Sequence, residues 1–127
     1  MTMLRALVVD DQPINLSLAT FVLQSQGFVV ACASSADEAI AMTAVFQPEV
    51  ILMDIQMPEV DGLEAVRRLR ADPDTRDLVI VALTAYAMKG DEQVMRAAGC
   101  DGYIAKPIDV VTFGASVRSI VAAMKGA

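Results

Sequence analysis

The chain has 127 residues, of which 55% are hydrophobic and 20% charged, and this composition excludes a disordered protein because it can bury a core. The formal net charge of −6 and the pI near 4.4 disfavour binding to the phosphate backbone of a nucleic acid. The sequence contains no histidine, which excludes catalytic triads, metal sites and general bases that need a histidine of this chain. We expect one acidic domain over residues 1–127.

The cysteines and the N-terminus indicate a cytoplasmic protein. Cys32 and Cys100 lie far apart and form no CxxC motif, which favours two buried thiols in a reducing compartment over a disulfide or a metal site. The N-terminus lacks the pattern of a signal peptide, and no apolar run approaches the roughly 18 residues that a membrane span needs. We therefore expect no association with a membrane.

Short apolar runs alternate with segments of helical periodicity. The apolar runs predict five buried strands, at 4–9, 28–33, 49–53, 78–83 and 102–105. Helices are predicted from Pro13 to a cap at Gly27, from a capping box at Ser35 to about Phe46, over 63–70, over 87–98 before Gly99, and after Asp109.

Apolar residues at helical spacing indicate the first helix and predict the core face of the last helix. In the first helix this stripe consists of Ile14, Leu18, Phe21 and Val22. In the last helix it consists of Phe113, Val117, Ile120, Val121 and Met124. The helix over 87–98 has the thinnest apolar stripe, so we expect it to be the least firmly held helix.

Strands that read as continuous apolar runs are typical of a parallel sheet that is covered by helices on both faces. Right-handed crossovers leave few topologies for five such units. We predict a doubly wound, flavodoxin-like α/β fold with the strand order 2-1-3-4-5.

Polar residues stand at the carboxyl ends of four of the predicted strands. They are Asp10 and Asp11 after the first strand, Asp54 after the third, Thr84 after the fourth and Lys106 after the fifth. In the predicted order the first and third strands are neighbours, so the three carboxylates should converge at the switch point of the sheet. Their mutual repulsion favours protonation unless a cation joins them, and Mg²⁺ suits oxygen ligands beside a phosphoryl group.

Each of these residues also has an ordinary structural interpretation. The aspartates could cap a helix or begin a turn, Thr84 could bond to the backbone, and the Lys106–Pro107 dipeptide could mark a turn alone. Their joint occurrence at successive strand ends favours phosphoryl transfer to an aspartate over these separate roles.

The sequence resembles the receiver domain of two-component response regulators over essentially its whole length. The matching segments are VVDDQP (8–13), LMDIQMP (52–58) with Asp61 and Gly62, ALTA (82–85) and GYIAKP (102–107). The segment TAYAMKGDE (84–92), with Gly99 and Cys100, looks like the stand-alone, DivK-type regulators, and it also recurs in receivers of hybrid kinases.

The resemblance implies a role for each matching position. Asp54 would accept the phosphoryl group and would bind Mg²⁺ together with Asp11 and the backbone carbonyl of Gln56, while Asp10 would act mainly through water. Lys106 would pair with a phosphoryl oxygen, and its bond to Pro107 is expected to be cis. Thr84 and Tyr103 would be the switch residues, and the small Ala85 would leave room for the phosphate.

The resemblance also implies partners. Because the chain has no histidine, the phosphodonor would be a histidine kinase or a histidine phosphotransfer protein, and the output would be a downstream protein target. We expect phosphorylation to bias a two-state equilibrium of the chain, which would be a monomer or weak dimer. Apolar residues at the rim of the site predict the surface for partner binding, namely Ile14, Leu18, Pro107 and Ile108. Leu18 could equally belong to the core.

Four alternatives remain at this point. The chain could be the receiver module of a hybrid kinase, or a pseudo-receiver that binds partners without phosphorylation. A phosphatase of the haloacid dehalogenase type would need a second aspartate where Gln56 stands. A flavin or dinucleotide module would need a phosphate-cradling loop where Asp10 and Asp11 would repel a phosphate.

Overall fold

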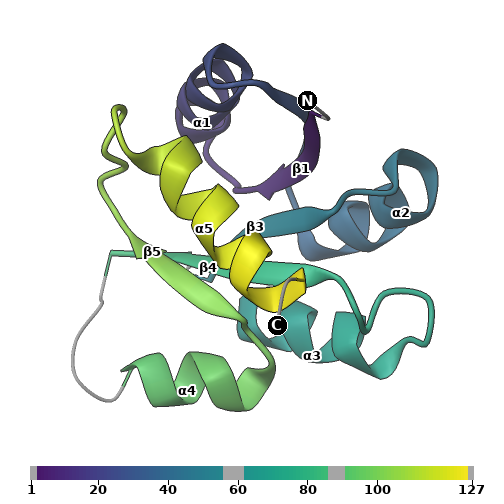
Figure 1. Cartoon of the computed structure of the whole chain (residues 1–127). Helices are drawn as coiled ribbons and strands as arrows, with labels where there is room; N and C mark the ends of the chain where they lie inside the picture. Colours follow the sequence, from purple (N-terminus) through teal and green to yellow (C-terminus); the bar gives the residue numbers. More distant parts are fainter. Residues whose placement is uncertain (1–2, 56–61, 86–90, 126–127) are drawn as a thin grey trace.

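The computed structural model describes residues 3–55, 62–85 and 91–125, and its secondary structure follows the predicted alternation (Figure 1). The strands are β1 (Leu4–Val9), β2 (Phe28–Ala33), β3 (Val50–Asp54), β4 (Val79–Thr84) and β5 (Gly102–Ala105). The helices are α1 (Pro13–Ser25), α2 (Ala36–Phe46), α3 (Gly62–Ala71), α4 (Asp91–Ala98) and α5 (Phe113–Lys125). The predicted beginning of the fourth helix, at residues 87–90, lies outside the described residues.

The strands form one parallel sheet in the order β2-β1-β3-β4-β5, which confirms the predicted topology. The register pairs Val9 of β1 with Met53 of β3, so Asp10 and Asp54, the next residues along, reach the same edge of the sheet. β3 and β4 are buried along their whole length, as their continuous apolar sequences predict.

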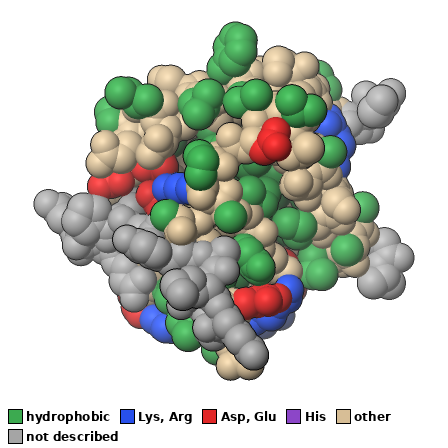
Figure 2. All heavy atoms as spheres, turned by 90° about the vertical axis from the view of Figure 1, so that its left-hand side faces the viewer, with side chains coloured by type: hydrophobic (Ala, Val, Ile, Leu, Met, Phe, Trp, Pro, Cys, Tyr) green, Lys and Arg blue, Asp and Glu red, His purple; other side chains and the backbone are tan. Residues whose placement is uncertain are grey.

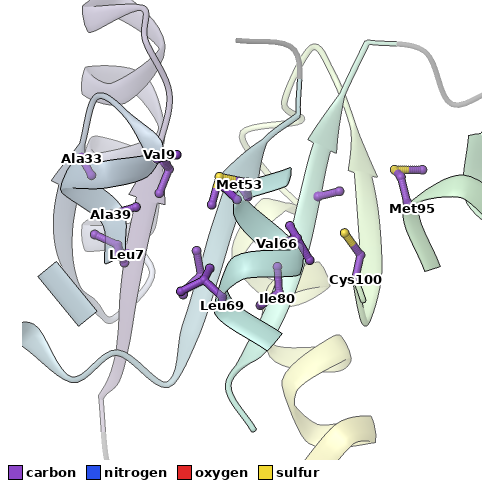
Figure 3. Close-up of a cluster of buried hydrophobic side chains, with 14 residues drawn as sticks. Leu7, Val9, Ala33, Ala39, Met53, Val66, Leu69, Ile80, Met95 and Cys100 are labelled. Atoms are coloured by element: carbon purple, nitrogen blue, oxygen red, sulfur yellow. The ribbon is translucent and has the colours of Figure 1, made fainter. Parts of the chain in front are cut away.

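The helices cover both faces of the sheet. On one face, α1 and α5 pack over a cluster that includes Leu23, Phe28 and Phe113. On the other face, α2, α3 and α4 contribute residues such as Ala39, Val66 and Met95 to a second cluster (Figure 3). Among the helices of the described residues, none has both the length and the hydropathy needed to span a bilayer.

Local signals placed several helix ends correctly. The Ser35 hydroxyl accepts a hydrogen bond from the Glu38 amide at the start of α2. Gly27 and Gly99 follow α1 and α4 with φ angles of +90° and +119°, a region that favours glycine. Asp109 differs from the prediction, because its carboxylate accepts hydrogen bonds in a turn at residues 110–112 and α5 begins only at Phe113.

Only one of the four apolar residues that indicated the first helix faces the core. Ile14, Leu18 and Phe21 are exposed, while the helix buries Val22 together with Ala19 and Leu23. Apolar residues lie on more than one side of α1, because Ile14 and Phe21 are exposed while Ala19 and Leu23 are buried, so periodicity alone could not select the inner face. In α5 the predicted stripe holds for Phe113, Val117 and Val121, which are buried, and for the partly buried Ile120, whereas Met124 is exposed near the end of the helix.

Candidate functional site

Three carboxylates meet at the carboxyl edge of the sheet. Oxygens of Asp10, Asp11 and Asp54 all lie within 4.8 Å of one another. Asp10 and Asp54 are only 2% and 3% exposed, and Asp11 is partly buried. The backbone positions Asp10 on both sides, because its amide donates to Ala33 of β2 and its carboxylate accepts from the Gln12 amide.

Lys106 brings a positive charge to these carboxylates from the end of β5. Its ammonium nitrogen lies 3.2 Å from an oxygen of Asp54 and 3.5 Å from one of Asp10. The backbone amide of Lys106 donates a hydrogen bond of 2.7 Å to the carbonyl of Thr84, which ties the end of β5 to the end of β4. Three carboxylates and one ammonium leave the site formally at −2, and buried oxygen donors of this charge suit a hard divalent cation.

The fourth strand contributes Thr84 as its last residue, and the Thr84 side chain is buried at this edge. Ala85 follows it and is exposed beside the site. The Lys106–Pro107 peptide bond is cis, as the family resemblance implies. Tyr103 is half-buried and packs against the core cluster under α2, α3 and α4. Gln56 lies outside the described residues.

Gly62, the first residue of α3, packs directly under the end of β3. A Cβ atom at this position would lie 2.5 Å from the carbonyl oxygen of Asp54 and 2.5 Å from the Cα of Ile55. Only a residue without a side chain therefore lets α3 approach the strand that carries Asp54. The sequence places a glycine here, but neither spacing nor composition reveals that it supports the site.

A groove of about 290 Å³ opens beside the carboxylates, between α1 and the segment that follows β5. Three of the four predicted rim residues line it, namely Leu18, Pro107 and Ile108, and it reaches Asp10 and Lys106. Ile14 does not line the groove but lies exposed on the same helix. The groove also contains Asn15, which the apolar pattern of the sequence does not predict as a rim residue because its side chain is polar. Figure 2 views this edge of the sheet and shows blue and red side chains in contact beside the green ones.

These observations define a doubly wound α/β domain with an acidic, lysine-containing site at the switch point of its parallel sheet. A family model described as the response regulator receiver domain matches residues 6–118. The chain belongs to this family.

Named relatives and solved structures agree with that assignment. The polar-differentiation response regulators DivK of Brucella ovis and Brucella melitensis are each 39% identical to the chain over 113 residues, which cover 89% of this chain and 92% of theirs. The chemotaxis response regulator CheY4 of Vibrio cholerae superposes with a TM-score of 0.87 at 28% identity, over 94% of this chain and 99% of its own.

A second similar structure is the receiver domain of a sensor histidine kinase. The receiver domain of the sensor histidine kinase PA1611 from Pseudomonas aeruginosa superposes with a TM-score of 0.82 at 31% identity, over 99% of this chain and 100% of that one. That structure holds a magnesium ion coordinated in its active-site cleft.

Proposed function

We propose that the chain accepts a phosphoryl group on Asp54 and thereby switches its contacts with partner proteins. The observation that carries this proposal is the position of the Asp54 carboxylate, which is buried, 3.2 Å from the Lys106 ammonium and beside the carboxylates of Asp10 and Asp11. A carboxylate acts as a nucleophile toward phosphorus where nearby cations neutralise the incoming oxygens.

The residues present fit a Mg²⁺ ion by the chemistry of their donor set. Asp10, Asp11 and Asp54 would hold the ion, with the backbone carbonyl of Gln56 as a further expected ligand. When bound, Mg²⁺ supplies positive charge that offsets the repulsion between the carboxylates and the phosphoryl oxygens.

The positions of the side chains support the following transfer step. A carboxylate oxygen of Asp54 forms the new bond to phosphorus, and the bond from phosphorus to a nitrogen of the donor histidine breaks, leaving its electron pair on that nitrogen. The donor histidine lies on a histidine kinase or a histidine phosphotransfer protein, because residues 1–127 contain none. Lys106 pairs with a phosphoryl oxygen, and the Thr84 hydroxyl donates to another.

Phosphorylation then changes the surface that a downstream target reads. Thr84 and Tyr103 belong to the adjacent strands β4 and β5. A shift of Thr84 toward the phosphoryl group would therefore change the packing around Tyr103. The half-buried state of Tyr103 leaves its ring able to move between the core and the surface. We expect the phosphorylated chain to bind its target as a monomer or weak dimer.

Two contexts are compatible with this activity. The similarity to DivK over 92% of the relative's length supports a stand-alone regulator, whereas the similarity to the PA1611 receiver supports a module of a hybrid kinase. The mass of the endogenous polypeptide on an immunoblot discriminates between the two. The free thiols of Cys32 and Cys100 support a reducing compartment such as the cytoplasm.

Phosphorylation by a small donor tests the proposal without a known partner. We expect acetyl phosphate with Mg²⁺ to add one phosphoryl group to the wild-type chain, measured by intact mass, and EDTA to prevent it. The Asp54→Asn variant, which keeps the size of the side chain, should stay unmodified. An unmodified wild type, or equal modification of the variant, would overturn the proposal and would favour a pseudo-receiver that binds partners without phosphorylation.

A further inference from the structure

β2 forms one edge of the sheet, and β1 is the only strand that pairs with it among the described residues. Its six residues, FVVACA, contain no charge and no proline, and all of them pair with β1 in one register without a bulge. Charged residues, prolines and bulges are features that keep edge strands from pairing with other chains. β5, at the other edge, has only four residues and lies between Asp101 and Lys106. The unprotected edge of this sheet is therefore β2.

The hydrogen bonds to β1 show which backbone groups of β2 point away from the sheet. The carbonyl of Ala33 accepts from the amide of Asp10, so Ala33 directs its backbone groups toward β1. In a parallel pair, alternate residues of a strand bond to the same neighbour, so Ala31 also faces β1. The amides and carbonyls of Val30 and Cys32 therefore point outward, where a further strand can pair with them.

The outer side of α1 adds a hollow and a protruding side chain to this edge. The hollow has a volume of about 410 Å³ and is lined by α1 residues such as Leu16 and Thr20 and by Cys32 of β2. Thr20 and Cys32 meet there, with their side-chain oxygen and sulfur atoms 3.1 Å apart. Phe21 also lines the hollow, and it is 72% exposed. One patch thus contains both an apolar side chain that protrudes and a space that can receive one, as a contact between identical patches requires.

The distribution of charge selects a second copy of the chain as the occupant of this edge. Each copy carries a net charge of −6, so two copies repel each other in most orientations. The longest stretch of the chain without a charged residue runs from Asp11 to Asp37, and it includes all of α1 and β2. The carboxylates that follow it have partners, because Asp37 pairs with Arg68 and Glu38 accepts from the Ser34 hydroxyl. Two copies therefore meet with the least repulsion along this edge.

We infer that two copies of the chain associate edge to edge through β2, in antiparallel pairing about a two-fold axis. This pairing joins the two sheets into one continuous sheet and places both α1 helices on the same face of it. Phe21 of each copy then faces the hollow of the other. None of the residues that line the hollow lines the groove beside Asp10 and Lys106, so the dimer leaves the acidic site open.

Sedimentation equilibrium tests whether the chain dimerises through this surface. We expect a reversible wild-type dimer with a Kd between about 10 µM and 1 mM, as for a small interface. Phe21→Glu should raise this Kd by about tenfold or more. The matched control is Val94→Glu, which adds the same charge on α4, at the far end of the sheet from α1 (Figure 1), and should change the Kd less than about threefold. A wild-type chain that is monomeric at about 1 mM would overturn the inference, and so would equal effects of the two variants.

Hydrogen exchange of single amides distinguishes strand pairing from any other dimer. We compare exchange by NMR at concentrations about tenfold below and tenfold above the Kd, and we expect the amides of Val30 and Cys32 to exchange about fivefold more slowly at the higher concentration. The amide of Ala31, which bonds to β1, should be protected at both concentrations. A dimer in which the amides of Val30 and Cys32 exchange as fast as in the monomer would show that another surface mediates association.

Val30→Pro removes one outward amide without removing a bond to β1, because proline is compatible with the open side of an edge strand. We expect this variant to stay monomeric, whereas Val30→Ala, which keeps the amide, should dimerise. Circular dichroism reports whether both variants are folded, and the exchange measurement on the wild-type chain decides the inference if Val30→Pro does not fold. Dimerisation of a folded Val30→Pro variant would overturn the inference. None of these measurements needs phosphorylation, so the inference and the proposed function fail independently.

Discussion

The ammonium nitrogen of Lys106 lies 3.2 Å from a carboxylate oxygen of Asp54, although Lys106 follows β5 and Asp54 ends β3, and these strands are not neighbours in the sheet. The same nitrogen lies 3.5 Å from Asp10. One cation is therefore shared between two buried anions, and the site keeps an excess of negative charge once Asp11 is counted. This imbalance explains how the site can favour a divalent cation while keeping a positive group for an incoming phosphoryl group.

Lys106→Met should change Mg²⁺ binding and phosphorylation in opposite directions. Removing the ammonium leaves three uncompensated carboxylates, so we expect Mg²⁺ affinity, measured by isothermal titration calorimetry, to rise about tenfold. Phosphorylation by acetyl phosphate should fall by about tenfold or more, because the phosphoryl oxygens lose their partner. Lys125→Met removes a lysine paired with Glu49 on the surface and should change neither quantity. Unchanged Mg²⁺ affinity in Lys106→Met would contradict this account of the charges.

Gly62→Ala should destabilise the chain through overpacking at the end of β3. The new Cβ would meet backbone atoms of Asp54 and Ile55 at 2.5 Å, and backbone cannot move aside as a side chain can. We expect a loss of roughly 1–3 kcal/mol in the free energy of unfolding, measured by urea denaturation. At Gly102 a Cβ would meet only the side chain of Ile120, at 3.1 Å, so Gly102→Ala should cost less. Equal effects of the two variants would refute the close approach of α3 to Asp54.

Arg70 joins the segments that precede β4 and β5, at the edge of the sheet opposite the acidic site. Its guanidinium donates to Asp101 at 2.7 Å and to the carbonyls of Gly99 and Leu78, and it is largely shielded from water. Arg70→Ala leaves a partly buried carboxylate and these carbonyls without their donor, so we expect a loss of about 2–4 kcal/mol by urea denaturation.

Arg70→Lys should not restore this stability, because an ammonium cannot reproduce the branched set of donors. The control for both variants is Arg68→Ala, which breaks an exposed ion pair with Asp37 and should cost less than about 1 kcal/mol. An equal loss in the free energy of unfolding for Arg68→Ala and Arg70→Ala would contradict this prediction, because the exposed ion pair would then stabilise the chain as much as the contacts of Arg70.

The thiol of Cys100 should make stability depend on pH in the alkaline range. Burial raises the pKa of Cys100 from 9.0 to about 11, and the nearby Arg70 guanidinium offsets part of this effect. Above pH 9 the unfolded chain therefore releases this proton before the folded chain does. The resulting loss of stability is absent below pH 9 and grows toward pH 11, to roughly 2–3 kcal/mol.

Urea denaturation from pH 8 to pH 11 measures this dependence, and Cys100→Ala should flatten it relative to wild type. The same burial should protect Cys100 from iodoacetamide at pH 8, while the more exposed Cys32 reacts first. A pH dependence that is identical in Cys100→Ala and wild type would show that another group is responsible.

The features that the sequence could predict are those encoded in local patterns. Continuous apolar runs predicted a parallel sheet, and the polar residues at their ends predicted the meeting of Asp10, Asp11, Asp54 and Lys106. The inner face of α1 could not be predicted, because apolar residues lie on more than one side of the helix and only its packing against β1 and β2 selects Ala19 and Val22. The sequence does show that α1 contains no charged residue.

Contacts between distant residues were equally out of reach. Nothing in the spacing of Arg70 and Asp101 predicts their ion pair, and nothing near Gln26 predicts its bridge to Val110 and Gly114. Such contacts join residues that are far apart in the sequence, so they depend on how the helices pack against the sheet.

We propose that Asp54, and no other carboxylate of the site, becomes phosphorylated. Borohydride reduces the acyl phosphate of a phosphorylated aspartate to homoserine, which peptide sequencing by mass spectrometry can locate. After treatment with acetyl phosphate and Mg²⁺, we expect homoserine at residue 54 alone. Homoserine at Asp10 or Asp11 instead, or none at residue 54 in a chain that carries a phosphoryl group, would contradict it.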